Sequence, residues 1–248
     1  MIDTKLFIQR WIQDPAYDLP FIMIEIIEPL KIALELHQNE VQAEKMSAYL
    51  RNQFAFYGIQ TPIRRNIFRE WKKHIPKDIT FEQRWELVFQ LCYSDKREMH
   101  YMAVDWLNSW NKSVYTHDDI KNVKVLIETN SWWDSVDLIA SNFVTNYFKK
   151  FPEMIVPIIE EWSATTNFWL HRSTLIFQLK YKHQTDLELL EKQINRFKEN
   201  NEFFIQKAIG WSLREVSKTN PDWTRNAIER LEIKGLAKRE ASKHLQEL

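Results

Sequence analysis

The chain has 248 residues but only 3 glycines. Tight hairpins between antiparallel strands need glycine at left-handed turn positions, so this scarcity disfavours a sheet-rich fold. Helices joined by short polar connections can form without glycine, and turn or capping residues interrupt the sequence regularly, as at Thr61-Pro62, Thr80, Asn130-Ser131 and Asn220-Pro221. These features predict an all-α protein.

Apolar periodicity places helices over most of the chain. We predict them at residues 4–13, 20–36, 38–56, 62–75, 80–94, 96–111, 117–131, 133–150, 152–165, 167–183, 185–199, 202–218, 221–231 and 236–247. From residue 80 onward they pair into helical hairpins that recur about every 32–37 residues, a spacing typical of helical-repeat solenoids. No flexible linker interrupts the chain. We therefore predict one α-solenoid domain over residues 1–248, curved into a superhelix with a concave face.

Charge and cysteine content restrict the partners and the compartment. Lysine plus arginine and aspartate plus glutamate each number 34, so any surface for nucleic acid must be a local basic patch. The single cysteine, Cys92, excludes an internal disulfide. No secretory signal is visible, and Glu25, Glu28 and Lys31 interrupt the apolar stretch 21–34, which excludes a bilayer span there. We expect a cytoplasmic protein with no membrane partner.

The predicted helix at 202–218 carries the clearest basic face. Apolar residues form a broad stripe on one side, and Lys207, Trp211, Arg214 and Lys218 share another. A tryptophan among three cations suits a nucleic-acid backbone with its sugar or base. The alternative is a partly buried tryptophan covered by the stems of solvated lysines.

Two further basic segments point the same way. Thr61 and Pro62, as N-cap and first helical residue, precede Arg64 and Arg65, and a helix N-terminus with arginines in its first turn is a plausible phosphate site. In the last predicted helix, Lys238, Arg239 and Lys243 follow Gly235 in the same manner. Each patch alone could be ordinary solvated surface. Three patches on repeats that share a concave side favour DNA.

The segment from Ser131 to Asp137, Ser-Trp-Trp-Asp-Ser-Val-Asp, combines aromatic and acidic residues. Ser131 is expected to be a helix N-cap with Asp134 at the third helical position. Asp137, one turn further on, is not needed as a cap, and it shares a helix face with Trp133 four residues earlier. Trp132 and Val136 are expected to be packing residues. The alternative is that both tryptophans are core residues and Asp137 pairs with a neighbouring arginine.

A glycosylase needs such a pair. Cleavage of the N-glycosidic bond of a cationic alkylpurine leaves an oxocarbenium-like sugar, which a fixed carboxylate stabilises. An aromatic face holds the cationic nucleotide. The histidines are scattered, and neither a two-metal carboxylate cluster nor a phosphate-binding glycine loop is present, so a metal-free mechanism without a cofactor is favoured.

The sequence also resembles the AlkD-type DNA alkylation repair glycosylases, which are built from HEAT-like repeats. The matching stretches cover roughly residues 25 to 248 and are 48–52, 58–65, 131–137, 169–172, 177–182, 202–221 and 238–244. The resemblance implies that Trp133 and Trp211 form an aromatic pair at the lesion-bearing nucleotide and that Asp137 is the catalytic carboxylate. It implies that Arg172 contacts the DNA backbone beside Asp137 and that Tyr49 lies at the cleft edge.

The expected function is therefore excision of N3- and N7-alkylated purines from duplex DNA by a monomer, without flipping the base into a pocket. Two departures stand out, namely residues 1–24, an apparent extra N-terminal helical element, and His171, where an uncharged polar residue is expected. The main alternative is a non-catalytic HEAT-like module that binds damaged or branched DNA. A protein-interaction solenoid is a more distant one.

Overall fold

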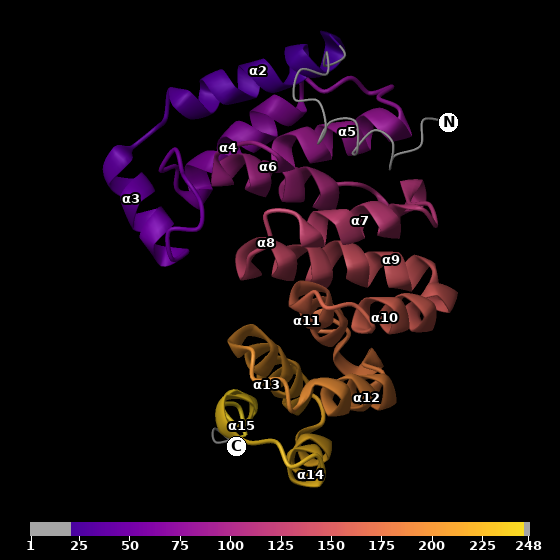
Figure 1. Ribbon diagram of the computed structural model, residues 1–248. Helices are drawn as coiled ribbons and strands as arrows, with labels where there is room; N and C mark the ends of the chain where they lie inside the picture. Colours follow the sequence, from indigo (N-terminus) through magenta and orange to yellow (C-terminus); the bar gives the residue numbers. More distant parts are fainter. Residues whose placement is uncertain (1–20, 246–248) are drawn as a thin grey trace. The chain divides into compact units, whose positions relative to one another are not determined.

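The structure, a computed structural model, describes residues 21–245 and is helical throughout that range (Figure 1). In the described range, extended pairing is confined to an isolated bridge between Ala55 and Lys96. The prediction of an all-α protein is thus confirmed. No helix between residues 21 and 245 combines the length and the apolar character needed to cross a bilayer.

The chain divides into two compact units, the first ending at Trp110 and the second beginning at Asn111. This division was not predicted, because no linker composition marks residue 110 in the sequence. The predicted helix at 4–13 and most of the extra element predicted for residues 1–24 lie outside the described residues. Curvature into one superhelix stays a prediction.

The first unit contains α2 (Phe21–Glu35), α3 (Glu40–Tyr49), α4 (Thr61–Lys72), α5 (Phe81–Cys92) and α6 (Arg97–Asn108). Thr80 and Gln83 begin α5 with a reciprocal capping box, as the break at Thr80 predicted. Aromatic rings join the helices. The Trp71 indole donates a hydrogen bond of 2.8 Å to the Ile26 carbonyl of α2 and lies edge-on to Trp106 of α6, with 6.3 Å between ring centroids.

The connection from α3 to α4 differs from the prediction, because the helix expected to reach residue 56 ends at Tyr49. A buried carboxylate organises the loop that follows, since Glu98 accepts the backbone N–H groups of Tyr57, Gly58 and Ile59 at 2.9–3.0 Å. Gly58 has a φ of 88°, and a side chain there would meet the Asn39 backbone. Such long-range pairing is invisible to helical periodicity.

The second unit combines α-helices with short 3-10 helices and a π-helical stretch. They are η1 (Lys112–Val114), α7 (Asp119–Glu128), α8 (Trp133–Leu138), η2 (Ile139–Val144), α9 (Thr145–Lys150), η3 (Pro152–Met154), α10 (Ile155–Ser163), α11 (Phe168–Ile176), η4 (Lys182–Gln184), α12 (Leu187–Phe197), α13 (Phe203–Ser217), α14 (Pro221–Arg230) and α15 (Gly235–Ala241).

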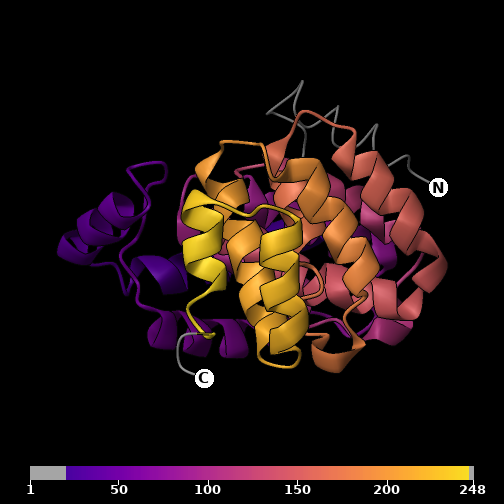
Figure 2. The same ribbon diagram turned by 90° about the horizontal axis from the view of Figure 1, so that it is seen from below.

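Four of these helices form a row, which we call the inner row: α8, α11, α13 and α15. Each packs on the next, and α10 and α12 lie on the other side of the unit (Figures 1 and 2). Ile209 and Leu213 of α13 are fully buried in the core between the layers, as the predicted apolar stripe requires. The inner row therefore gathers side chains from segments that extend from Trp133 to Ala241 in the sequence.

The helix predicted over 133–150 contains a π-helical stretch, η2, directly after α8. The buried Thr145 hydroxyl bridges this stretch by contacting the carbonyls of Ala140 and, on the neighbouring repeat, Phe177. π-Helical turns frequently occur beside functional sites, where they change the direction of a helix face. Here the π-helical stretch lies between α8, which carries Asp137, and α9.

Candidate functional site: a carboxylate fixed on the inner row

Asp137 lies in α8, whose first turn differs in detail from the prediction. The N-cap is Trp132, in an extended conformation, and not Ser131. The Ser131 hydroxyl donates instead to the Ile127 carbonyl at 2.5 Å and so caps the end of α7. Asp134 still serves the helix start, because its Oδ1 accepts the Ser135 N–H at 2.9 Å. The prediction of Ser131 as N-cap was wrong because its hydroxyl could serve either helix end.

An arginine from the next helix of the row holds the Asp137 carboxylate. Arg172 of α11 donates from Nε to Oδ1 at 2.7 Å and from Nη2 to Oδ2 at 2.8 Å, and its Nη1 donates to the Phe204 carbonyl of α13. The Asp137 side chain is 13% exposed and the Arg172 side chain is 5% exposed. Bidentate pairing fixes the plane of the carboxylate as well as its position. One guanidinium thereby ties three helices together.

This pairing changes the role of Arg172. All three guanidinium nitrogens donate inside the protein, and the residue is 4% exposed. In this conformation Arg172 therefore positions Asp137, and the geometry does not support the expected direct contact between Arg172 and the DNA backbone. The alternative in which Asp137 pairs with a neighbouring arginine matches the observed contact.

The environment of Asp137 affects its protonation in opposite directions. Burial raises the pKa of the Asp137 carboxyl above its ordinary value, and the negative charge of Asp134 acts in the same direction. The hydrogen bonds and charge of Arg172 act against this and favour the carboxylate. Each oxygen accepts one bond from Arg172 and keeps a further lone pair, so the group can still face a cation or orient a water.

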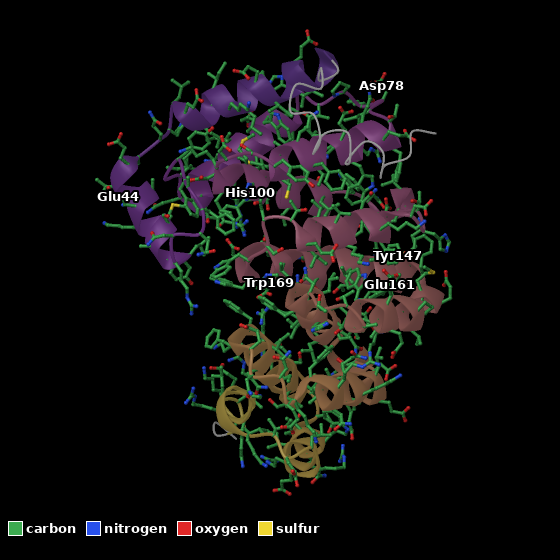
Figure 3. All side chains as sticks on the ribbon, viewed as in Figure 1. Glu44, Asp78, His100, Tyr147, Glu161 and Trp169 are labelled. Carbon is green, nitrogen blue, oxygen red and sulfur yellow. The ribbon has the colours of Figure 1, made fainter. Side chains whose placement is uncertain are left out.

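Aromatic side chains surround the pair. Trp133 begins α8, is half-buried, and lies on the same face as Asp137 one turn later. Trp132, predicted to be a packing residue, lies against Trp169 and Phe204, with ring centroids 5.8 and 5.2 Å apart; Figure 3 labels Trp169 in α11. That prediction is confirmed, and so is the one for Val136, which is fully buried.

The predicted basic face of α13 is present but is not simple solvated surface. Trp211 is half-buried against the core, and Lys207 and Arg214 both pair with Glu240 of α15 at 3.0 and 3.3 Å. Lys218 pairs within its own helix with Glu215 at 2.5 Å. In α15, Lys238 and Arg239 are exposed. Four of the five cations belong to two adjacent helices of the inner row, and Lys218 is the C-cap of α13.

His171, the unexpected neighbour of Arg172, points away from that pair. It stacks on Phe197 with 4.5 Å between ring centroids, and its Nε2 lies 2.8 Å from the Thr165 carbonyl. Burial lowers the pKa of His171 below its ordinary value. His171 is therefore a packing residue on the opposite side of α11.

The remaining predicted residues belong to the first unit and are described within it. Tyr49 is 72% exposed at the end of α3. Arg64 is buried, with its guanidinium paired to Asp105 and 4.9 Å from the Tyr101 ring centroid. The interpretation of Arg64 as a surface DNA contact is therefore corrected. The start of α4 also differs, because Gln60 is the N-cap and Pro62 the second residue.

Arg65 of the first unit is exposed and lines an open cavity of about 600 Å³. Its other lining residues are Pro62, Asn66, Phe68, Arg69, Asp105, Asn108 and Ser109. Consecutive residues of an α-helix point in different directions, so Arg64 faces the core while Arg65 faces solvent. Sequence reasoning treated the two arginines alike because it could not fix the rotation of α4.

Two contributors to the site were not among the predicted residues: the Phe204 carbonyl and Glu240. The carbonyl carries no sequence signal. Glu240 and Lys243 are three residues apart, a spacing that predicts a pair on one helix, and both Lys243 contacts to the Glu240 carboxylate are 2.8 Å. Nothing in that spacing shows that α13 brings two more cations to the same carboxylate.

Fold and site together define an all-helical protein that fixes one carboxylate on a guanidinium, beside aromatic rings and a group of cations. The chain belongs to the DNA alkylation repair enzyme family, whose family model matches residues 30–245. Among solved structures it is similar to a predicted DNA alkylation repair enzyme from Enterococcus faecalis, with 34% identity and a TM-score of 0.77. That match covers 85% of this chain and 98% of the other. No curated protein matches the chain.

Proposed function

We propose that the protein is a DNA glycosylase that hydrolyses the N-glycosidic bond of N3- and N7-alkylated purines in duplex DNA. The observation that carries the proposal is the Asp137 carboxylate, held in a fixed plane by Arg172 and sharing a helix face with Trp133. The family supports a DNA substrate with alkylation damage.

The chemistry follows from the state of the leaving group. An alkylated purine already carries positive charge, so its departure requires no general acid. The developing charge is then on the sugar, and a carboxylate that cannot rotate away stabilises it without reorganisation. Because Arg172 occupies one lone pair of each Asp137 oxygen, we assign Asp137 electrostatic stabilisation and orientation of the attacking water. Trp133 and Trp211 supply aromatic faces for the cationic nucleotide.

The cations of α13 and α15, namely Lys207, Arg214, Lys218, Lys238 and Arg239, are proposed to hold the DNA backbone. The concave face of a HEAT-like superhelix, a monomeric state and a cytoplasmic location remain predictions from the sequence. Tyr49 and Arg65 of the first unit belong to the same proposal as backbone contacts.

One observation favours a second candidate, a non-catalytic module that binds damaged or branched DNA. The negative charge of Asp137 would repel a DNA backbone, which argues against keeping it in a pure binding protein. Its pairing with Arg172 neutralises that charge and gives it a structural role. The carboxylate alone therefore does not separate the two functions, and an assay must.

The test is release of 7-methylguanine from methylated duplex DNA, compared with spontaneous loss without protein. Asp137→Asn keeps the size of the side chain but removes its charge, and we expect release to fall by about 10²–10³-fold. The matched control is Asp134→Asn, which removes a nearby carboxylate but keeps the oxygen that accepts the Ser135 N–H. Its release of 7-methylguanine should stay within a few-fold of that of wild type.

No release above the spontaneous rate by the wild-type protein, on this and on 3-methyladenine-containing DNA, would reject the glycosylase. The binding module would then stand if the same preparation retained damaged duplex. Equal activity of Asp137→Asn and Asp134→Asn would reject Asp137 as the catalytic group. Both variants are assayed well below their unfolding transitions so that loss of activity is not loss of fold.

A further inference from the structure

Glu240 of α15 carries an unusual share of positive charge for one buried carboxylate. Lys207 and Arg214 of α13 pair with it at 3.0 and 3.3 Å. Lys243, which follows the end of α15, pairs with it at 2.8 Å. The Glu240 side chain is 8% exposed, whereas Lys207, Arg214 and Lys243 are 38%, 28% and 50% exposed. The carboxylate is thus covered by cations that remain open to solvent.

The close approach of two helices creates this arrangement. Gly210 of α13 faces α15, and a Cβ atom at Gly210 would lie 2.5 Å from the Cβ of Glu240 and 2.7 Å from the Ala237 carbonyl oxygen. A residue with a side chain would push the helices apart. Glycine therefore allows the Glu240 carboxylate to reach the cations of α13, where Lys207 and Arg214 are two helical turns apart on one face.

The charges do not balance inside the protein. One carboxylate is sufficient for one cation, but three surround it, which leaves a local net charge of +2. Burial alone raises the pKa of Glu240, yet the hydrogen bonds and charges of Lys243 and Lys207 outweigh it and hold that pKa below its ordinary value. Glu240 stays ionised and orders the three cations, which would otherwise repel one another.

A half-buried indole borders the group, because Trp211 lies four residues after Lys207 and three before Arg214. An ordered group of cations with excess positive charge beside an aromatic ring suits a phosphodiester followed by its sugar. We propose that Lys207, Arg214 and Lys243, positioned by Glu240, form a seat for a single phosphate of the DNA backbone. The proposal rests on the DNA substrate of the proposed function, and Glu240 is a positioning residue in it.

The number of phosphates in the seat can be counted from the salt dependence of binding to unmodified duplex. Each neutralised phosphate contributes about 0.9 to the slope of log affinity against log salt. The double variant Lys207→Ala/Lys243→Ala, which leaves Arg214 to pair with Glu240, should reduce the slope by about 0.9 in total. Two independent cation–phosphate contacts would reduce it by about 1.8 instead. The matched control is Lys234→Ala, 82% exposed and outside the seat.

The role of Glu240 is tested by the sign of an affinity change. Glu240→Gln makes the protein one charge more positive, so general electrostatics predicts tighter binding to DNA. Positioning predicts the reverse, because the cations lose the group that orders them, and we expect several-fold weaker binding. Glu232→Gln makes the same charge change at a site that is 74% exposed, and it should bind as tightly as wild type or slightly tighter.

Three results would overturn the proposal of a single-phosphate seat. They are an unchanged salt slope in Lys207→Ala/Lys243→Ala, a reduction of that slope by about 1.8, or tighter DNA binding by Glu240→Gln. If millimolar inorganic phosphate raised the melting temperature of wild type but not of the double variant, while the DNA slope stayed the same, the site would be one for free phosphate and the proposal would fail. Far-UV circular dichroism shows whether each variant is folded.

These outcomes are separate from those of the proposed function. Binding to unmodified duplex involves no base release, so a confirmed seat in a protein that releases no base would leave only the glycosylase rejected. Release that depends on Asp137, together with an unchanged slope, would leave only the seat rejected.

Discussion

The ion pair between Asp137 and Arg172 makes a prediction about stability that its geometry allows us to estimate. The perturbation is a double-mutant cycle of Asp137→Ala, Arg172→Met and both together. Methionine retains most of the length of the arginine stem without its charge or its three donors. The cycle isolates the interaction between the two groups from the loss of each side chain.

The magnitude follows from burial and from what each change leaves behind. Removing one partner of a buried pair costs about 3–5 kcal/mol, because the other charge stays uncompensated. Arg172→Met leaves a carboxylate that is 13% exposed and can draw water, so we expect a cost of about 3 kcal/mol. Asp137→Ala leaves a guanidinium that is 5% exposed with the Phe204 carbonyl as its one remaining acceptor among the contacts described, and should cost more.

The double variant removes both charges, so it should cost less than the sum of the single variants, with a coupling free energy of about 2–3 kcal/mol. At about 2–4 °C per kcal/mol for a chain of this size, Arg172→Met should melt roughly 6–12 °C below wild type, and Asp137→Ala should melt lower still. Differential scanning calorimetry measures the shift on the transition of the unit that contains the pair.

The mutual dependence of the two charges would be refuted if the losses in free energy of unfolding of the two single variants simply added in the double variant. It would also be refuted if Arg172→Met lowered that free energy by less than about 1 kcal/mol, since neither charge would then need the other to stay buried. A matched comparison is the exposed pair of Glu191 and Arg230, whose side chains are 31% and 49% exposed. Its cycle should give a much smaller coupling because solvent screens it.

Two further predictions concern the surroundings of the site. Gly210→Ala should destabilise the protein by about 1–3 kcal/mol, measured by chemical denaturation, because its Cβ meets the backbone of α15; equal stability would mean that the helices separate without cost. His171→Gln should flatten the pH dependence of stability in acid. Since burial lowers the pKa of His171, its contribution is full above a pH of about 6.5 and declines as the pH falls below it, so identical melting curves of both proteins from neutral to acidic pH would contradict this assignment.

Much of the local structure follows from the sequence. Glycine scarcity and apolar periodicity predicted an all-α protein, and the predicted helix at 202–218 corresponds to α13 at Phe203–Ser217. Asn220 and Pro221 begin α14 as a cap and a first residue, because their preferences act within one turn. Helix bounds failed where distant residues intervene, as after Tyr49, where Glu98 draws the chain into a loop.

For the candidate site, too, the sequence predicted the local relations along each helix but not the contacts between helices. The sequence placed Trp133 and Asp137 on one helix face and Lys207, Trp211 and Arg214 on another, since these relations depend only on 3.6 residues per turn. Resemblance to a family supplied the association of Asp137 with Arg172. The resemblance also implied that Arg172 faces the DNA backbone, whereas its guanidinium faces the carboxylate in the structure.

Only the tertiary structure decided how the charges are used. The packing of α8, α11 and α13 turned Arg172 inward onto Asp137, and the close approach at Gly210 gathered three cations on Glu240. The physical reason is that an ion pair depends on distances of a few ångströms between groups far apart in sequence. Periodicity fixes which residues share a face, but only the packed helices determine which charges meet.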